Sequence, residues 1–153
     1  MCGRIMDEWK NALRRHVAVG VRTTSELIRL IQPGDWDKRP IPGKRSVYEV
    51  AVHLAVLLEA DLRIATGVTA AEMADFYAVP VPVDQIVDRL DQSFQYYEQR
   101  LLTGFTTRPT YWGVADDSTG WLMEAAVHLY HHRSQLFDYL NVLGYEFDLA
   151  LFE

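Results

Sequence analysis

Apolar side chains recur every three or four positions along four stretches of this chain, which is the spacing of helices that bury one face. The pattern predicts helices over about residues 7–31, 47–66, 84–104 and 119–143. Segments that contain proline and glycine, or that lack the apolar repeat, separate them. Four long helices joined in this way predict an all-α protein, a four-helix bundle in which residues 1–153 form one domain.

Capping signals locate several of the predicted helix ends. Ser46 and Glu49 have the spacing of a capping box at the start of the second long helix. Thr69 and Glu72 have the same spacing, which predicts a short helical turn before a proline-containing extended stretch. Asp84 is the expected N-cap of the third long helix.

Composition and net charge exclude several classes of protein. The formal net charge is -6, with 21 acidic residues against 15 Lys and Arg, and the basic residues form no dense run. Nucleic-acid binding is therefore not expected, because it needs a concentrated basic surface. The single cysteine excludes an intramolecular disulfide, and no apolar stretch reaches the roughly 18 residues of a membrane span. We expect a soluble, cytoplasmic protein that does not bind membranes.

The histidines are the strongest chemical signal in the sequence. Of five histidines, three fall within five positions of the last predicted helix, at His128, His131 and His132. Residues four apart lie one helical turn apart on the same side, so His128 and His132 can converge on one metal ion. The helical repeat turns His131 away from this pair. The spacing therefore favours His128 and His132 as ligands.

A metal site needs at least one more ligand from another helix. His53 lies at the edge of the apolar face of the second predicted helix, which suits a residue that faces a pocket between helices. His16 lies nearer the centre of the apolar face of the first helix and is the other candidate. An isolated histidine on an apolar face is more often a packed core residue than a ligand, so spacing alone leaves both alternatives open.

Four charged residues are candidates to support such a site. Glu49 and Glu124 each precede a candidate ligand by four residues, so each can accept a hydrogen bond from that imidazole. Asp61 falls within an apolar face, where we expect it to pair with an arginine, or to act as a general base if it reaches the cavity. Arg133 is expected to bind a carboxylate or to form a surface ion pair.

Two segments carry a resemblance to a known family. Residues 121–136, WLMEAAVHLYHHRSQL, resemble the last helix of the DinB/YfiT-like superfamily, whose pattern is H-x-x-x-H-R-G-Q. Residues 48–54, YEVAVHL, resemble its second helix, which carries a single ligand histidine. Ser134 stands where the family often has glycine. The likeness in segment spacing and length covers nearly the whole chain.

The resemblance implies a four-helix bundle that binds one divalent transition metal through His53, His128 and His132. Nickel or zinc is the expected metal, with iron or manganese as alternatives, because imidazole is a ligand for several of these ions. Three imidazoles with an open position are typical of a catalytic site rather than a structural one. His16 has no ligand counterpart in the family. Members of the family often form homodimers, so a homodimer is a further expectation.

Several functions are compatible with this resemblance. Family members include metal-dependent enzymes that use low-molecular-weight thiols, which implies S-transfer from a small-molecule thiol to a small electrophile. A metal-dependent hydrolase and a non-catalytic, stress-related metal-binding protein are the alternatives. A ferritin-like di-metal site is excluded, because it needs several inward glutamates and Glu-x-x-His pairs that the sequence lacks.

Overall fold

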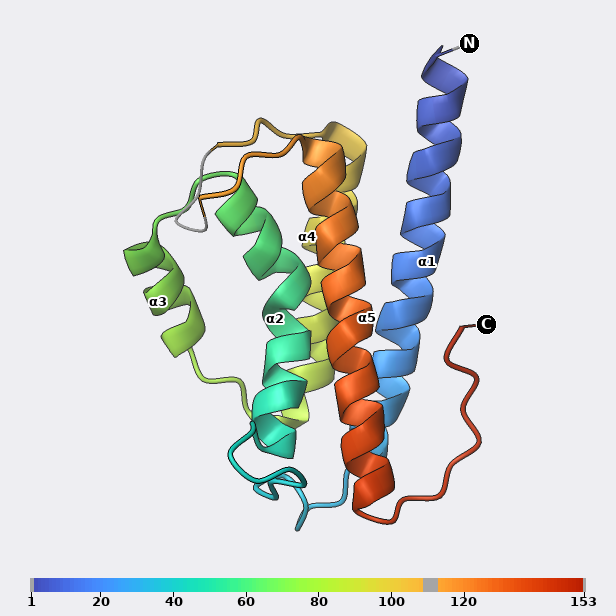
Figure 1. Ribbon diagram of the computed structural model, residues 1–153, viewed down its shortest axis with the longest axis vertical. Helices are drawn as coiled ribbons and strands as arrows, with labels where there is room; N and C mark the ends of the chain where they lie inside the picture. Colours follow the sequence, from blue (N-terminus) through green and yellow to red (C-terminus); the bar gives the residue numbers. More distant parts are fainter. Residues whose placement is uncertain (1, 109–112, 153) are drawn as a thin grey trace.

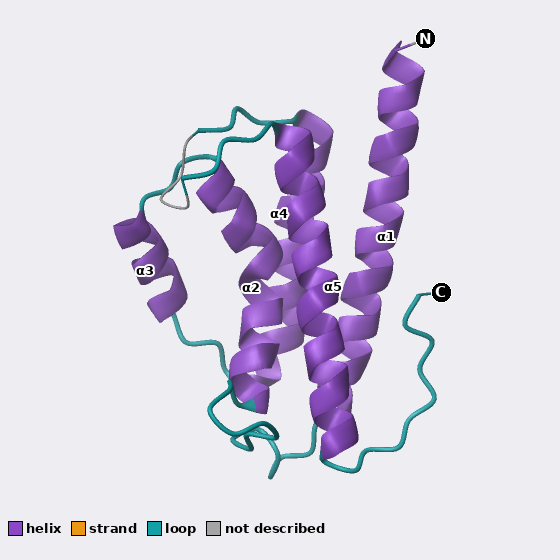
Figure 2. Cartoon of the chain, viewed as in Figure 1, coloured by secondary structure: helices purple, strands orange, loops and turns teal. Residues whose placement is uncertain are grey.

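The computed structural model describes residues 2–108 and 113–152, and the side chains of residues 2–6 are not described. Its elements are the helices α1 (Cys2–Leu30), α2 (Val47–Ala65), α3 (Ala70–Ala78), η1 (Val83–Gln85), α4 (Ile86–Thr103) and α5 (Ser118–Val142), of which η1 is a 3-10 turn. The part of the chain that the structure describes contains helices and loops but no strand (Figure 2). The all-α prediction is confirmed.

The four long helices α1, α2, α4 and α5 form the bundle, and α3 lies outside it beside α2 (Figure 1). Helix α2 packs against α4 and α5, and α1 packs against the same two helices. The order around the bundle is therefore α1, α4, α2, α5. The segment after α5 turns back alongside α1 (Figure 1). The predicted four-helix bundle is confirmed, with α3 as an addition on its surface.

The core explains why these segments fold as helices. Their apolar residues at helical spacing are buried on the inner faces, and several are completely inaccessible to solvent, among them Val17, Leu54, Leu57, Leu90, Leu129 and Leu136. Burial of such faces supplies most of the stability of helices in a bundle. Because α2 is apolar on most of its circumference, it occupies the most buried position, and its polar residues His53 and Asp61 must find partners there.

Both predicted capping boxes are present. The Glu49 backbone N–H donates to Ser46 Oγ at 3.1 Å, and the Ser46 N–H donates to Glu49 Oε2 at 2.7 Å. Thr69 and Glu72 form the same pair of bonds at the start of α3. The turn predicted there is longer than expected, since α3 has nine residues.

The prediction that Asp84 caps the third long helix is wrong. The chain enters this helix through η1, in which the Gln85 N–H donates to the Pro82 carbonyl at 2.9 Å. Asp84 lies inside this turn, and Gln85 precedes α4 without a side-chain cap. Pro82 suits the position before a tight turn because its φ is fixed and it needs no N–H partner there. By contrast, Asp117 does cap α5, accepting from the Gly120 N–H at 2.9 Å.

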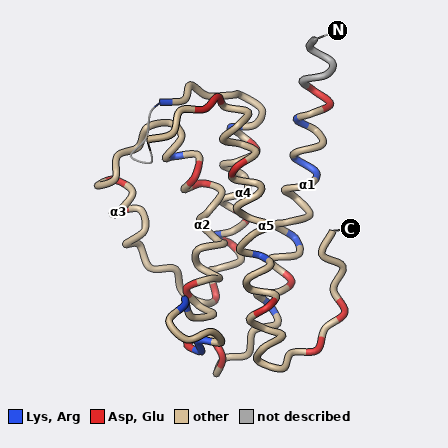
Figure 3. Tube along the Cα trace, viewed as in Figure 1, with Lys and Arg blue, Asp and Glu red and all other residues tan. Residues whose placement is uncertain are grey.

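Charged residues of both signs are interspersed along the chain trace (Figure 3). Within the described residues, none of the helices is both long enough and apolar enough to cross a membrane.

Candidate metal centre

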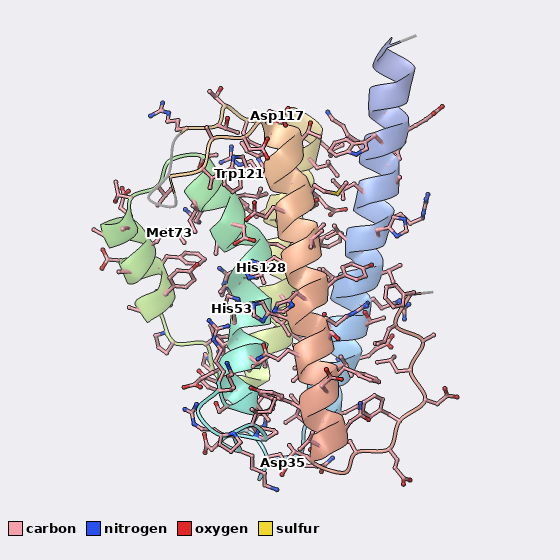
Figure 4. The ribbon with its side chains drawn as sticks, viewed as in Figure 1. Asp35, His53, Met73, Asp117, Trp121 and His128 are labelled. Carbon is pink, nitrogen blue, oxygen red and sulfur yellow. The ribbon has the colours of Figure 1, made fainter. Side chains whose placement is uncertain are left out.

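Three histidines from two helices meet between α2 and α5. His53 comes from α2, and His128 and His132 come from successive turns of α5; one ligand nitrogen of each lies within 4.8 Å of the others. The ring of His53 is 4.4 Å from that of His132 and 5.3 Å from that of His128, centre to centre. Figure 4 shows His53 and His128 lying next to each other where α2 and α5 run side by side. The residues that the sequence pattern and the resemblance favoured are therefore neighbours.

The remaining two histidines lie outside this cluster. His131 is exposed on α5, although its ring centre is 4.8 Å from that of His132. The prediction that His16 lies near the centre of the apolar face of its helix is wrong, because the structure exposes it. The buried face of α1 runs instead through Leu13 and Val17, and the His16 carbonyl accepts a hydrogen bond from the Tyr130 hydroxyl.

Asp61 and Gln135 determine which ring nitrogens face the centre of the cluster. Asp61 is only 4% exposed, and its Oδ2 lies 2.8 Å from His128 Nδ1. Gln135 Oε1 lies 2.8 Å from His132 Nδ1, while the other end of this amide donates to Tyr139 at 3.4 Å. A carboxylate and an amide oxygen accept hydrogen bonds, so each Nδ1 carries the proton. The Nε2 atoms of His128 and His132 are then both acceptors.

These two acceptors face each other at 3.1 Å. Two lone pairs at this distance repel unless a proton or a metal ion lies between them. Two nitrogens that each lie about 2.1 Å from one tetrahedral zinc ion are about 3.4 Å apart, close to this separation. The donor set therefore fits a divalent transition metal, and the cluster can hold such an ion.

The electrostatics favour the protonation state that metals require. Burial lowers the pKa of His53 to about 3, with further contributions from the charges of His132 and Arg45. Burial also lowers the pKa of His132 to about 4, although the bond to Gln135 opposes this shift. Both imidazoles are therefore neutral near pH 7, as a ligand must be.

Two surface hollows lie beside the cluster, and one of them is lined by His128. One, of about 240 Å³, is lined by residues of α5 that include His131 and Gln135, together with Ile41 from the loop before α2. The other, of about 450 Å³, is lined by Glu124, Val127, His128 and His131. No additional His, Cys, Asp or Glu joins the three histidines within the described residues. Three protein ligands are one fewer than the four of a closed structural zinc site.

The two glutamates predicted to support the site lie at its margins. Glu49 does not bond to His53; its carboxylate binds Arg39 through two hydrogen bonds of 2.9 Å and completes the capping box with Ser46. The Arg39 guanidinium accordingly lowers the pKa of Glu49. Glu124 is exposed on the wall of the larger hollow. Burial, followed by the charge of Asp61, raises the pKa of Glu124.

Asp61 and Arg133 have partners other than those expected. Asp61 pairs with none of the arginines whose side chains are described, because the packing of α2 on α5 presents it to His128 instead. Arg133 is 2% exposed and forms no ion pair with the residues that the structure describes. It points toward α1 and the C-terminal segment, donating to Thr23 Oγ1 at 3.0 Å and to the Leu151 carbonyl.

Gln135 was not singled out from the sequence. Its position three residues after His132, on the same side of the helix, was the available signal.

Replacing Asp61 with asparagine is expected to lower metal affinity by about 10- to 100-fold, because a neutral amide holds and polarises the His128 imidazole less well than a carboxylate. Competition against a fluorescent chelator measures this change. Asp75→Asn, an exposed change on α3, is the control and should leave the affinity unaltered. Equal affinities for all three proteins would show that Asp61 has no influence on the site.

Comparison with known proteins supports the assignment of the fold. The family model described as the DinB superfamily matches residues 19–136. A crystal structure of a protein from Exiguobacterium sibiricum 255-15, assigned to the DinB family, shares 76% sequence identity and superposes with a TM-score of 0.93. The match covers 94% of this chain and 97% of that chain. A search of curated proteins found no match. With most of its length matched in this way, the chain belongs to the DinB superfamily.

Proposed function

We propose that this protein is a divalent-metal-dependent enzyme that transfers a low-molecular-weight thiol to a small electrophile. The observation that carries the proposal is the pair of Nε2 acceptors of His128 and His132, which face each other at 3.1 Å beside His53. A zinc or nickel ion held by His53, His128 and His132 would lower the pKa of a bound thiol and so supply the nucleophile.

The residues of the chain have separate tasks in this reaction. The three histidines offer their lone pairs, while Asp61 and Gln135 keep the rings of His128 and His132 in orientation. The two hollows that His131 lines admit the thiol and the electrophile. The thiol sulfur forms a bond to the electrophilic carbon, the leaving group departs with the bonding electron pair, and the thiol proton passes to solvent.

A transfer assay tests the proposal. Untagged protein loaded with zinc or nickel is mixed with a thiol, either bacillithiol or cysteine, and with 1-chloro-2,4-dinitrobenzene, whose chloride leaves as the S–C bond forms. We expect a metal-dependent rate that is lost in His132→Ala and retained in Asp75→Asn, an exposed change on α3. Metal-loaded protein that gives no rate above background with either thiol would contradict the transferase assignment while leaving the metal site standing.

Metal-dependent hydrolysis is the second candidate, and the position of Glu124 favours it. Glu124 and His128 line the same hollow, so a carboxylate is available to take a proton from an attacking water there. Hydrolysis of p-nitrophenyl acetate by the Glu124→Gln variant separates the two candidates. A hydrolase would lose most of its metal-dependent rate, whereas a thiol transferase would keep its transfer rate in the same variant.

A further inference from the structure

A cavity of about 330 Å³ lies between α2, α4 and α3 with the extended segment that follows α3. Val56 of α2, Phe76 of α3 and Val81 of the extended segment form its apolar wall, and Asp88 and Arg89 of α4 contribute charged groups. The hydroxyl of Tyr48 donates to the Val81 carbonyl at 2.9 Å and holds this segment against α2. Neither Asp61 nor any of the three clustered histidines lines this cavity, so it is distinct from the candidate metal centre.

Arg89 forms part of the wall of this cavity. Its Nη2 forms an ion pair with Glu59 Oε2 at 2.8 Å, and its guanidinium carbon lies 5.5 Å from the centre of the Phe76 ring. Its side chain is 19% exposed, and its Nη1 is buried without a hydrogen-bond partner among the described residues. A buried donor without a partner is costly, and a turn of the guanidinium toward an acceptor in the cavity would remove this cost.

The charges around Arg89 favour an anionic acceptor. Glu59 also binds Arg63, with 2.7 Å between its Oε1 and Arg63 Nη2, so one carboxylate is shared by two guanidinium groups. This trio carries a net charge of +1. Asp88 opposes it, but Asp88 is exposed, and solvent screens its charge more than that of the partly buried Arg89.

We propose that this cavity is a second ligand site, which binds a small monocarboxylate with an apolar body. The carboxylate pairs with the Arg89 guanidinium in the cavity wall, and the apolar body packs on Val56, Phe76 and Val81. The volume is at the lower end of that of small-molecule pockets, about 300–1,000 Å³, which suits a ligand of six to eight heavy atoms. The proposal does not depend on the function of the metal centre.

The test compares two probes of equal length that differ in charge. Hexanoate and 1-hexanol are titrated into the ¹⁵N-labelled full-length protein, and amide chemical shifts report both the location and the affinity of binding. We expect hexanoate to shift the amides of residues 76–92 with saturation, and 1-hexanol to bind them about tenfold more weakly or worse, since only hexanoate pairs with the guanidinium.

Two matched variants test the role of Arg89 itself. Arg89→Gln and Arg63→Gln each remove one guanidinium from Glu59, but only Arg89 lines the cavity. We expect Arg89→Gln to weaken hexanoate binding about tenfold or more, and Arg63→Gln to change it less than about threefold. The amide spectrum of each variant shows whether it is folded.

Three results would overturn the proposal. Equal affinity for hexanoate and 1-hexanol would leave an apolar hollow without an anion site. Equal losses in both variants would assign the effect to Glu59 rather than to Arg89. Shifts confined to the amides around His53 and His132 would place the carboxylate at the candidate metal centre. If Arg89→Gln fails to fold, the comparison of hexanoate with 1-hexanol on the parent protein still tests whether the cavity binds an anion.

Discussion

Replacing His132 with alanine will lower the affinity for zinc or nickel by on the order of a thousandfold, because it removes one of three ligand imidazoles. The loss also leaves His128 Nε2 without the partner that faces it at 3.1 Å. Plasma mass spectrometry of untagged protein is expected to find about one equivalent of metal in the parent and almost none in the variant. Circular dichroism should show unchanged helicity, since His132 is only partly buried.

The neighbouring residue provides the matched control. His131→Ala removes an imidazole one position away, on the same helix, from a ring whose centre is 4.8 Å from that of His132. Because His131 is exposed and does not join the cluster, this variant should keep its metal. Equal metal loss in both variants, or metal retained in both, would contradict the assignment of His53, His128 and His132 as the ligand set.

Replacing Leu129 with alanine will destabilise the protein by about 2–5 kcal/mol. Leu129 is completely buried and lies in the turn of α5 between His128 and His132. Its side chain packs closely against Gly20 of α1. A Cβ added at Gly20 would lie only 2.9 Å from Leu129 Cδ2. The variant loses the burial of this side chain and leaves a cavity at the helix crossing. Urea denaturation measures the change in the free energy of unfolding.

This measurement is best made in the presence of a chelator. A metal that binds only the folded state adds RT ln(1 + [L]/Kd) to the free energy of unfolding and would mask a change in the core. Val127→Ala is the control, since Val127 is on the same helix but 63% exposed. It should change stability by less than about 0.5 kcal/mol. A similar loss in both variants would mean that the α1–α5 contact does not form as described.

The resemblance of two short segments was sufficient to name the residues that meet at the candidate metal centre. The i, i+4 spacing of His128 and His132 needs only a helix, and the helix follows from the apolar repeat around it. His53 lies on another helix, so spacing alone left it in competition with His16. The family likeness separated the two, and the structure brings only His53 into the cluster.

Of the two residues that orient these imidazoles, one lies on the same helix as its histidine and the other on a different helix. Gln135 is three residues from His132, and their bond is within reach of one helix. Asp61 and His128 are 67 residues apart, and no local rule pairs them. Burial of an acid predicts that it has a partner, but the identity of the partner depends on which helices pack together.

The sequence by itself determined the long helices, the capping boxes and the histidine pair on α5, because each depends on interactions between residues a few positions apart. Only the tertiary structure decided that Asp61 meets His128 and that Arg133 turns to α1. It also decided that Arg89 lines a cavity under α3. The rotation and neighbours of each helix are set by packing over the whole bundle, so contacts between distant residues cannot be read from local periodicity.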